Sequence, residues 1–290
     1  MPKGINYWAF PPGDDGSPAD PLDAIRVARG LGFDCFELTV DPAGPISLAT
    51  TAAEAERVRR GAESLGLRLV TVATGLAWST SPTHPDPAVR DRAVQQCEKV
   101  IEIASWLGAE TLLYIPGMVS AVFVPEFVPQ PYDRVDAWAR ESLQRLLPTA
   151  ERLGVRIAVE NVWNRYLLSP LEMRDFIDSF GSPLVGAYFD VGNVMLYGHP
   201  EHWIEILGPR ILAVHLKDFR VSVGNLDGFV DLLSGDVDYP AVMCALRQTG
   251  YDGPLTVEIV PGKAGDVEKA AAALTIIERM WATAESRSAA

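Results

Sequence analysis

The feature that most constrains the fold is the alternation of short apolar runs with longer segments of helical periodicity. Eight such runs recur along the 290 residues, beginning near Gly4, Phe33, Leu67, Glu110, Val155, Leu184, Arg210 and Pro254. Runs of this length, rich in valine, isoleucine and aromatic residues, are typical of buried strands. The chain is therefore expected to repeat one strand-and-connection unit eight times.

Between the runs, the apolar residues recur every three or four positions, which predicts amphipathic helices. The segment after Pro87 is the clearest example, with Val89, Ala93, Val94, Cys97, Val100, Ile101 and Ala104 on one helical face. Similar patterns follow Pro21, Ala52, Asp136, Pro170, Pro200, Tyr239 and Gly265. A Leu-Gly pair then precedes the next run at Gly32, Gly66, Gly108 and Gly154. Glycine is a common stop signal at the C-terminus of a helix.

Eight strand-and-helix units predict a parallel sheet covered by helices, and eight units close naturally into a (β/α)8 barrel. A doubly wound open sheet is the alternative. The first run, however, leads to Pro-Pro-Gly-Asp-Asp-Gly and not to the GxGxxG fingerprint of dinucleotide-binding sheets. No linker divides the sequence. We therefore expect residues 1–290 to form a single barrel domain in which residues 285–290 fray.

Composition narrows the class of protein. Apolar residues make up 48% and charged residues 22% of the chain, as in soluble globular proteins, and the net charge is −13. An acidic chain is a poor candidate for binding nucleic acid. Three isolated cysteines, Cys35, Cys97 and Cys244, predict neither a disulfide framework nor a zinc knuckle. The longest apolar stretch, 67–78, is too short and too polar to span a membrane, and the N-terminus lacks a signal-peptide pattern. These features predict a cytoplasmic protein.

Runs five to eight each end in an ionisable residue, namely Glu160, Asp190, His215 and Glu258. In a barrel the C-terminal ends of the strands carry the chemistry, and neighbouring strands lie ~4.8 Å apart. Any one of these residues could be a helix cap or an ion-pair partner, so the inference rests on the set. Three converging carboxylates would repel one another unless a cation lay between them. Three oxygen ligands and one imidazole suit Mn²⁺, Mg²⁺, Co²⁺ or Zn²⁺.

Several passages of the second half carry a family resemblance. They are Ile157–Asn161, Tyr188–Asn193, Ile211–Asp218, Gly235–Pro240 and Gly250–Glu258. They resemble the sugar phosphate isomerase/epimerase family, a group of xylose-isomerase-like barrels. This group includes ketose 3-epimerases, hydroxypyruvate isomerases and inosose dehydratases, and it is related to endonuclease IV. The resemblance covers nearly the whole chain and is specific for the superfamily, but it does not identify a substrate.

The resemblance implies a reaction. One divalent ion, Mn²⁺ in the first place, would be held by Glu160, Asp190, His215 and Glu258. The two glutamates would also be the catalytic acid and base, and they would move a proton next to the carbonyl of a small ketose or sugar phosphate through an enediolate. A carbonyl-bound metal stabilises such an enediolate, and carboxylates on two sides of a sugar can exchange protons with both faces.

Three alternatives remain open. A metal-dependent dehydratase of an inosose-like or 3-keto sugar would use the same proton abstraction, followed by loss of a β-hydroxyl. A non-catalytic sugar-binding barrel would not need all four ligand types. An abasic-site nuclease would require three zinc ions with additional histidine ligands, whereas this chain has four histidines in all and a net charge of −13.

Two positions depart from ketose 3-epimerases that act on free sugars. These enzymes carry a histidine where this chain has Asn193 and a second glutamate where it has Tyr166. The Asp-Val-Gly-Asn form of the strand-six motif resembles the sugar-phosphate epimerase branch instead.

Further side chains at the strand ends are candidates for substrate binding. Lys217 is expected on the same side of its strand as the histidine two residues earlier, where it would contact a substrate oxygen or form an ion pair. Glu37 would orient a substrate hydroxyl or be a buried hydrogen-bonded carboxylate. Asn161 would contact a ligand or orient the neighbouring glutamate. Asn193 and Trp163 complete the set, the tryptophan as an apolar wall of the pocket.

The segment from Pro116 to Pro131 combines prolines with Val and Phe residues and follows the fourth run. An apolar loop at that end of a barrel suits a lid over the site or a contact in a homodimer. The expected partner is thus a small sugar or sugar phosphate, with no nucleic acid and no membrane, and the apolar loop permits a homodimer.

Overall fold

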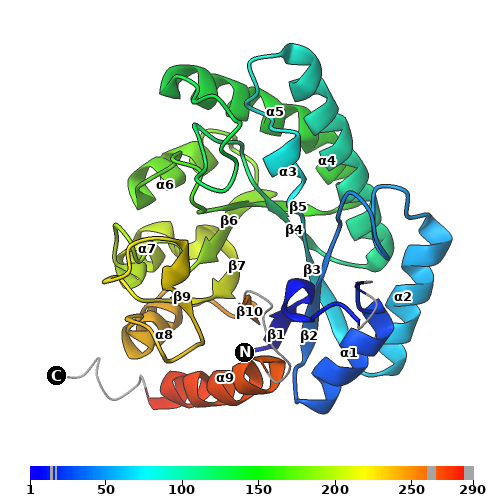
Figure 1. Cartoon of the computed structure of the whole chain (residues 1–290), viewed down its shortest axis with the longest axis vertical. Coiled ribbons are helices and arrows are strands. Elements are labelled where there is room, and N and C mark those ends of the chain that lie inside the picture. Colours follow the sequence, from blue (N-terminus) through cyan, green and yellow to red (C-terminus); the bar gives the residue numbers. More distant parts are fainter. Residues whose placement is uncertain (14–15, 17, 260–265, 284–290) are drawn as a thin grey trace.

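The computed structural model describes residues 1–13, 16, 18–259 and 266–283. Eight parallel strands close into a barrel in the order β1-β10-β7-β6-β5-β4-β3-β2, and helices surround it (Figure 1). The barrel strands are β1 Lys3–Asn6, β2 Cys35–Thr39, β3 Arg68–Ala73, β4 Thr111–Tyr114, β5 Arg156–Glu160, β6 Val185–Asp190, β7 Ile211–Leu216 and β10 Leu255–Val257. All eight predicted runs are barrel strands, so the predicted (β/α)8 fold is confirmed. The expected fraying of residues 285–290 lies outside the described residues.

The helices begin and end where the sequence supplies caps. Their bounds are α1 Pro21–Gly30, α2 Ala52–Ser64, α3 Leu76–Ser79, α4 Pro87–Leu107, α5 Tyr132–Leu153, α6 Pro170–Asp178, α7 Pro200–Leu207, α8 Tyr239–Gln248 and α9 Asp266–Thr283. Thr51 and Ser169 each form a capping box at the start of a helix. Gly108 and Gly154 end α4 and α5 with φ of 75° and 67°, a conformation that favours glycine.

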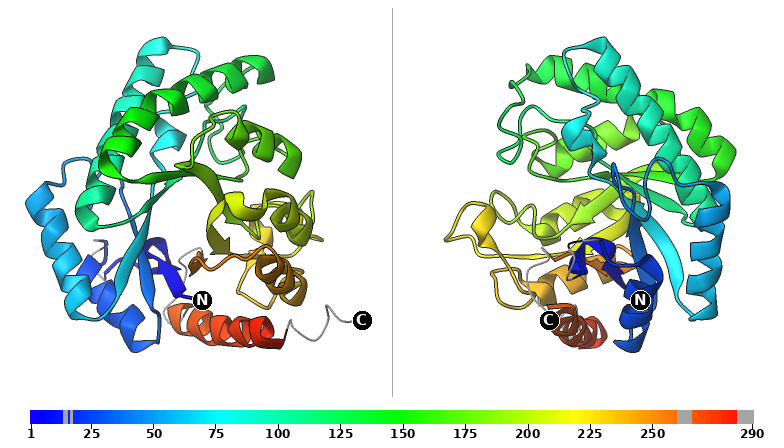
Figure 2. Two further views of the ribbon diagram at one scale, coloured as in Figure 1. Left: turned by 180° about the vertical axis from the view of Figure 1, so that it is seen from behind. Right: turned by 45° about the vertical axis from the view of Figure 1, so that its right-hand side comes forward.

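The last helix completes the ring around the barrel. Helix α9 lies beside α8 (Figure 2), and Glu278 on α9 pairs with Lys3 at the start of β1 at 3.4 Å. This arrangement brings the two ends of the described chain together at the closure of the sheet. In the described part of the chain, no helix is both long enough and apolar enough to cross a bilayer.

Among the described residues, the buried apolar side chains of the barrel interior are three alanines, one leucine, one isoleucine and one tyrosine. They are Ala73, Leu113, Ile115, Ala158, Tyr188 and Ala213. The larger apolar core lies between the strands and the surrounding helices. Alanines in the lumen leave space for polar side chains at the C-terminal ends of the strands. There the register places Asp190 opposite His215, and it places Glu160 opposite Tyr188, two residues before Asp190 on β6.

The segment between β7 and α8 contains a hairpin that the sequence did not predict. Strands β8 (Asp218–Phe219) and β9 (Phe229–Val230) have two residues each, too few to show an apolar period. The Asp218 carboxylate organises this segment by accepting hydrogen bonds from the backbone N–H groups of Phe219, Gly235 and Val237 at 2.8, 3.0 and 3.2 Å. A Cβ on Gly235 would lie 2.2 Å from this carboxylate. The Gly235 motif therefore allows a close approach of the backbone to Asp218.

We expect Asp218→Asn to lower the free energy of unfolding by about 1–3 kcal/mol, because a buried amide cannot accept all three backbone hydrogen bonds. Urea denaturation of the variant and the wild type measures this difference. Asp227→Asn, on the same segment, is the control and should change stability by less than about 0.5 kcal/mol. Equal stability of Asp218→Asn and the wild type would contradict this role.

Candidate active site

Four predicted ligands meet at the C-terminal end of the barrel. Glu160, Asp190 and His215 lie on β5, β6 and β7, and Glu258 directly follows β10. Each offers one ligand atom, and these atoms all lie within 4.8 Å of one another. The strands place them there because parallel strands with matched register end at the same edge of the barrel.

The four side chains fit a divalent ion. Three of their buried atoms, Asp190 Oδ2, His215 Nδ1 and Glu258 Oε2, have no well-directed hydrogen bond. The imidazole Nδ1 lies 2.6 Å from Glu258, 3.6 Å from Glu160 and 3.9 Å from Asp190. Buried polar atoms are normally hydrogen-bonded, and exceptions require an explanation such as a missing ion. Three carboxylates and one imidazole nitrogen are suitable ligands for a divalent transition metal.

Lys217 supplies positive charge at the same place. Its Nζ lies 3.0 Å from Asp190 Oδ2 and 3.0 Å from Glu258 Oε1. Lys217 directly follows β7, and its ammonium group reaches the same cluster as His215. Burial disfavours the charged amine, but the carboxylates of Asp190 and Glu258 outweigh burial and raise the pKa of Lys217. The ammonium group therefore balances part of the acidic charge and shares two candidate ligand residues with any bound cation.

The two glutamates are held in different protonation states. Burial raises the pKa of Glu160 to about 7. Burial acts in the same direction on Glu258, but the positive charges of Lys217 and His215 outweigh it and hold its pKa at about 2. At neutral pH the metal-free cluster therefore holds Glu258 ionised and Glu160 partly protonated.

The asparagines and Trp163 form a chain that holds Asp190. Asn161 Nδ2 donates to the Asp190 carbonyl oxygen, and the Asp190 N–H donates to Asn161 Oδ1, both at 2.8 Å. The Asn193 N–H donates to Asp190 Oδ1 at 2.8 Å, and Asn193 Nδ2 donates to the Asn161 carbonyl oxygen at 3.0 Å. Trp163 Nε1 donates to the Asn193 carbonyl oxygen at 2.8 Å. These bonds favour a supporting role for both asparagines, which is one of the two alternatives for Asn161.

Glu37 lies beneath the cluster, inside the barrel. Its carboxylate is fully buried and accepts hydrogen bonds from Tyr188 at 2.6 Å and from Asn6 at 2.5 Å, and it lies 2.6 Å from His215 Nε2. The geometry thus favours the buried hydrogen-bonded carboxylate over direct contact with a substrate. Asn6 and Tyr188 were not predicted as site residues. The strand alternation offered a signal, because Tyr188 has the same parity as Asp190 on β6.

Tyr166 points away from the cluster, toward the outer helices. Its hydroxyl donates to Asp136 of α5 at 2.7 Å, and Asp136 pairs with Arg140 at 2.8 Å. Where free-sugar epimerases are expected to hold a second glutamate, this chain therefore has an anchor for the loop that follows β5.

Aromatic side chains surround the mouth of the site. Trp163 packs against Phe219 and Phe229 with centroids 5.5 and 5.2 Å apart, and Trp78 packs edge-on against Phe123 at 4.6 Å. Phe123 belongs to the irregular segment between β4 and α5, which contains the predicted apolar loop. The role of this loop as a lid or a dimer contact stays a prediction.

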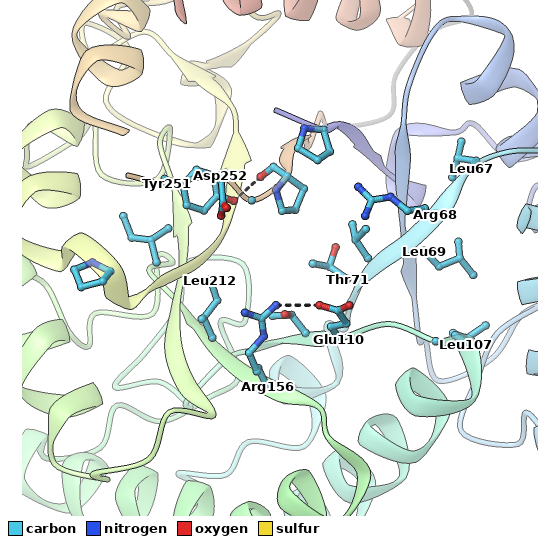
Figure 3. A pocket seen from close by; sticks show the side chains of 18 of the residues that line it. Leu67, Arg68, Leu69, Thr71, Leu107, Glu110, Arg156, Leu212, Tyr251 and Asp252 are labelled. Carbon is cyan, nitrogen blue, oxygen red and sulfur yellow. Dashed lines mark hydrogen bonds and ion pairs between the residues drawn. The ribbon is translucent and has the colours of Figure 1, made fainter. Parts of the chain in front are cut away.

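A cavity of about 780 Å³ lies at the opposite end of the barrel, where the strands begin. Arg68, Thr71, Glu110, Arg156 and Asp252 are among its lining residues (Figure 3). Arg156 pairs with Glu110 across part of it at 3.5 Å. Because barrel chemistry is located at the C-terminal ends of the strands, we place the functional site at the carboxylate cluster.

Known proteins resemble the chain over nearly its whole length. Residues 25–280 match the sequence model of a family described as "Xylose isomerase-like TIM barrel". The L-ribulose-5-phosphate 3-epimerase UlaE of Salmonella paratyphi C is 24% identical over 262 residues, which cover 89% of this chain and 87% of that protein.

Solved structures agree in fold. A structure of L-ribulose 3-epimerase superposes with a TM-score of 0.79 at 20% identity, covering 99% of this chain and 97% of that one. A D-psicose 3-epimerase with D-tagatose from Clostridium cellulolyticum H10 gives 0.77 at 16% identity, covering 97% and 99%. At these identities the likeness shows the shared barrel.

Proposed function

Because the chain belongs to the xylose isomerase-like TIM barrel family, we infer that it is a sugar isomerase or epimerase, and we propose that it depends on a divalent metal. The proposed substrate is a small ketose or sugar phosphate, and the proposed reaction moves a proton on the carbon next to the carbonyl. The names of its relatives, an L-ribulose-5-phosphate 3-epimerase and ketose 3-epimerases, support this class of reaction.

The observation that carries the proposal is the cluster itself. Glu160, Asp190, His215 and Glu258 converge within 4.8 Å at the end of the barrel where chemistry is located. Three of these side chains present buried atoms without a directed hydrogen bond. An ion in contact with substrate oxygens would stabilise negative charge that develops on them, and Mn²⁺ is the first candidate.

Two glutamates of the cluster would carry out the proton transfer. Glu258, which is ionised at neutral pH even without a metal, would remove the proton next to the carbonyl, and Glu160 would return one. Their strands, β5 and β10, are separated in the sheet by β6 and β7, so the two carboxyl groups approach the cluster from different sides. Asp190 and His215 would act as ligands alone.

The substrate would be held by the mouth of the site. Lys217 is the cation nearest the cluster and would bind a substrate oxygen once a metal takes its carboxylate partners. Trp163 would form an apolar wall against the sugar and exclude water. Asn161 and Asn193 would act through Asp190, which they position.

The test combines metal analysis with proton exchange. Purified protein is assayed for bound metal and incubated in deuterated water with a panel of ketoses and ketose phosphates. One bound divalent ion per chain and solvent deuterium on the carbon next to the carbonyl would support the proposal. Loss of deuterium exchange after a chelator removes the metal would show that the exchange depends on the metal. If no metal binds, a non-catalytic sugar-binding barrel is favoured. If metal binds and a β-hydroxyl is lost instead, the protein is a dehydratase.

We expect metal affinity to rise with pH. The ligands must be deprotonated to bind, and burial keeps Glu160 protonated below about pH 7, while the charges of Glu37 and Glu258 overcome burial and raise the pKa of His215. Binding should therefore release one to two protons, and affinity should fall about tenfold or more per pH unit below ~7. Calorimetry in buffers of different ionisation enthalpy counts the protons. Affinity that is constant between about pH 6 and 8 would contradict this linkage.

A further inference from the structure

The two ring nitrogens of His215, the histidine of the cluster, face different environments. His215 Nδ1 faces the carboxylates of Glu160, Asp190 and Glu258. His215 Nε2 faces the opposite way, into the barrel, and lies 2.6 Å from Glu37 Oε1. The ring is fully buried, so water does not replace either partner.

We propose that Glu37 is a positioning residue that holds the proton of His215 on Nε2 and thereby presents the Nδ1 lone pair to a divalent ion. This inference rests on the metal site of the proposed function and assigns a role to a residue outside the ligand set. A metal binds a ring nitrogen only through its lone pair, so ligation by Nδ1 requires the proton on Nε2, and a buried N–H requires an acceptor.

The strand order shows that the contact spans the barrel. Glu37 is on β2 and His215 on β7, and these strands are separated in the sheet by β1 and β10. The two side chains therefore meet across the lumen and not along one sheet edge. The small residues of the lumen, such as Ala73 and Ala213, leave the space for this contact.

The surroundings of Glu37 fix it as an acceptor. Asn6 Nδ2 donates to Oε1, and the Tyr188 hydroxyl donates to Oε2. Asn6 is itself held, because its Oδ1 accepts the N–H of Trp8 at 2.6 Å. Asn6, Tyr188 and His215 can all donate to the Glu37 carboxylate, which is an acceptor alone when it is ionised.

Packing against an aromatic ring also restrains the orientation of the His215 imidazole. The Tyr188 ring packs against it with centroids 4.3 Å apart, and the same tyrosine donates to Glu37. A rotation of the imidazole would break the Nε2 contact and move against this ring. Tyr188 and Glu37 together therefore fix both the tautomer and the orientation of the ligand.

The first measurement uses the wild-type protein. Nitrogen-15 spectra of histidine-labelled protein resolve few signals, because the chain has four histidines. With Zn²⁺ bound, we expect His215 to show a protonated Nε2 and a metal-bound Nδ1. A proton on Nδ1, with the metal on Nε2, would overturn the proposal without any variant, so the test stands even where a variant fails to fold.

The second measurement compares metal affinity in two variants. In Glu37→Gln we expect Mn²⁺ affinity, measured by calorimetry, to fall about 10- to 100-fold, since the neutral amide is a weaker partner for the Nε2 proton. The matched control is Asp136→Asn, which removes another carboxylate bonded to a tyrosine, far from the cluster, and should bind Mn²⁺ as the wild type does.

The outcomes separate this inference from the proposed function. If the wild type binds metal and a folded Glu37→Gln binds it equally tightly, Glu37 merely fills the lumen and the inference is wrong. If the wild type binds no divalent ion, the proposed function itself fails. A parallel fall in both variants would show a general effect of lost stability and would also overturn the positioning role.

Discussion

In the Glu258→Gln variant we expect proton exchange next to the substrate carbonyl to slow by about 10²- to 10⁴-fold, the usual contribution of a positioned acid or base. The carboxylate of Glu258 is the strongest candidate for the base. Lys217 and His215 outweigh burial and hold its pKa at about 2, so it is ionised at neutral pH. The amide of the variant has nearly the same shape but accepts no proton.

In the Glu160→Gln variant we expect proton exchange to slow by a comparable factor, because Glu160 is the proposed second member of the acid–base pair. Burial raises the pKa of Glu160 to about 7 in the metal-free site, and a bound divalent ion would lower this pKa, so its proposed acid–base role rests on its place in the cluster opposite Glu258. If each glutamate serves one face of the substrate, each variant loses epimerisation, while slow exchange without inversion is retained at the face served by the other. Proton NMR in deuterated water distinguishes exchange from inversion.

The control for both variants is Glu151→Gln, an exposed glutamate near the C-terminal end of α5 and outside the apolar loop. It should exchange and epimerise at the wild-type rate. Metal content is measured in parallel, because both catalytic glutamates are also proposed ligands. A variant at Glu160 or Glu258 that keeps its metal and epimerises within about tenfold of the wild type would remove that residue from the acid–base pair.

The sequence predicts the strands, and the convergence of the four candidate ligands, because both depend on local features. Each barrel strand is an apolar run, and each candidate ligand lies at or just after the end of its strand, where the strand meets the open end of the barrel. His215, for example, follows the buried Val214 in sequence and faces Asp190 through the register of neighbouring strands. Once eight strands close into a barrel, these positions can only converge.

The network beneath the ligands could not be predicted in the same way. Glu37 and His215 are 178 residues apart, and their strands are not neighbours in the sheet. Nothing in the local pattern distinguishes a carboxylate that reaches across a lumen from one that faces solvent. The β8–β9 hairpin could not be predicted from a local pattern either, because hydrogen bonds to the Asp218 side chain stabilise it and its strands show no apolar alternation.

The sequence leaves two roles open for Lys217, namely contact with a substrate oxygen and an ion pair. In the structure its ammonium group occupies the position where it would compete with a metal ion. Its ammonium group contacts Asp190 Oδ2 and Glu258 Oε1, and both residues are proposed metal ligands. The lysine side chain is 15% exposed, so its charge is only weakly screened by water. A divalent ion at the cluster would therefore compete with Lys217 for these two carboxylates and drive its ammonium group toward the substrate.

Lys217→Met is accordingly expected to change metal affinity and activity in opposite directions. Without the competing charge, Mn²⁺ should bind about tenfold more tightly or better, because unit charges ~4 Å apart near a protein surface interact by several kcal/mol before displacement and solvent reduce the effect. The metal-free variant should melt at a lower temperature than the wild type, since three carboxylates lose a counter-charge, and added Mn²⁺ should raise its melting temperature by more. Deuterium exchange should still fall about 10- to 100-fold, through loss of a charged hydrogen bond to the substrate.

The control, Lys99→Met, removes a partly exposed lysine of α4 that pairs with Glu102 on the same helix, and it should leave all three quantities unchanged. Calorimetry, thermal melting and exchange measured on one preparation of each variant decide between the roles. Weaker Mn²⁺ binding in Lys217→Met would mean that the lysine assembles the carboxylates for the metal instead of competing with it. If Mn²⁺ binds more tightly and the exchange rate is unchanged, Lys217 is only a counter-charge of the metal-free site. The residue that binds the substrate oxygen would then lie in the loops around the site.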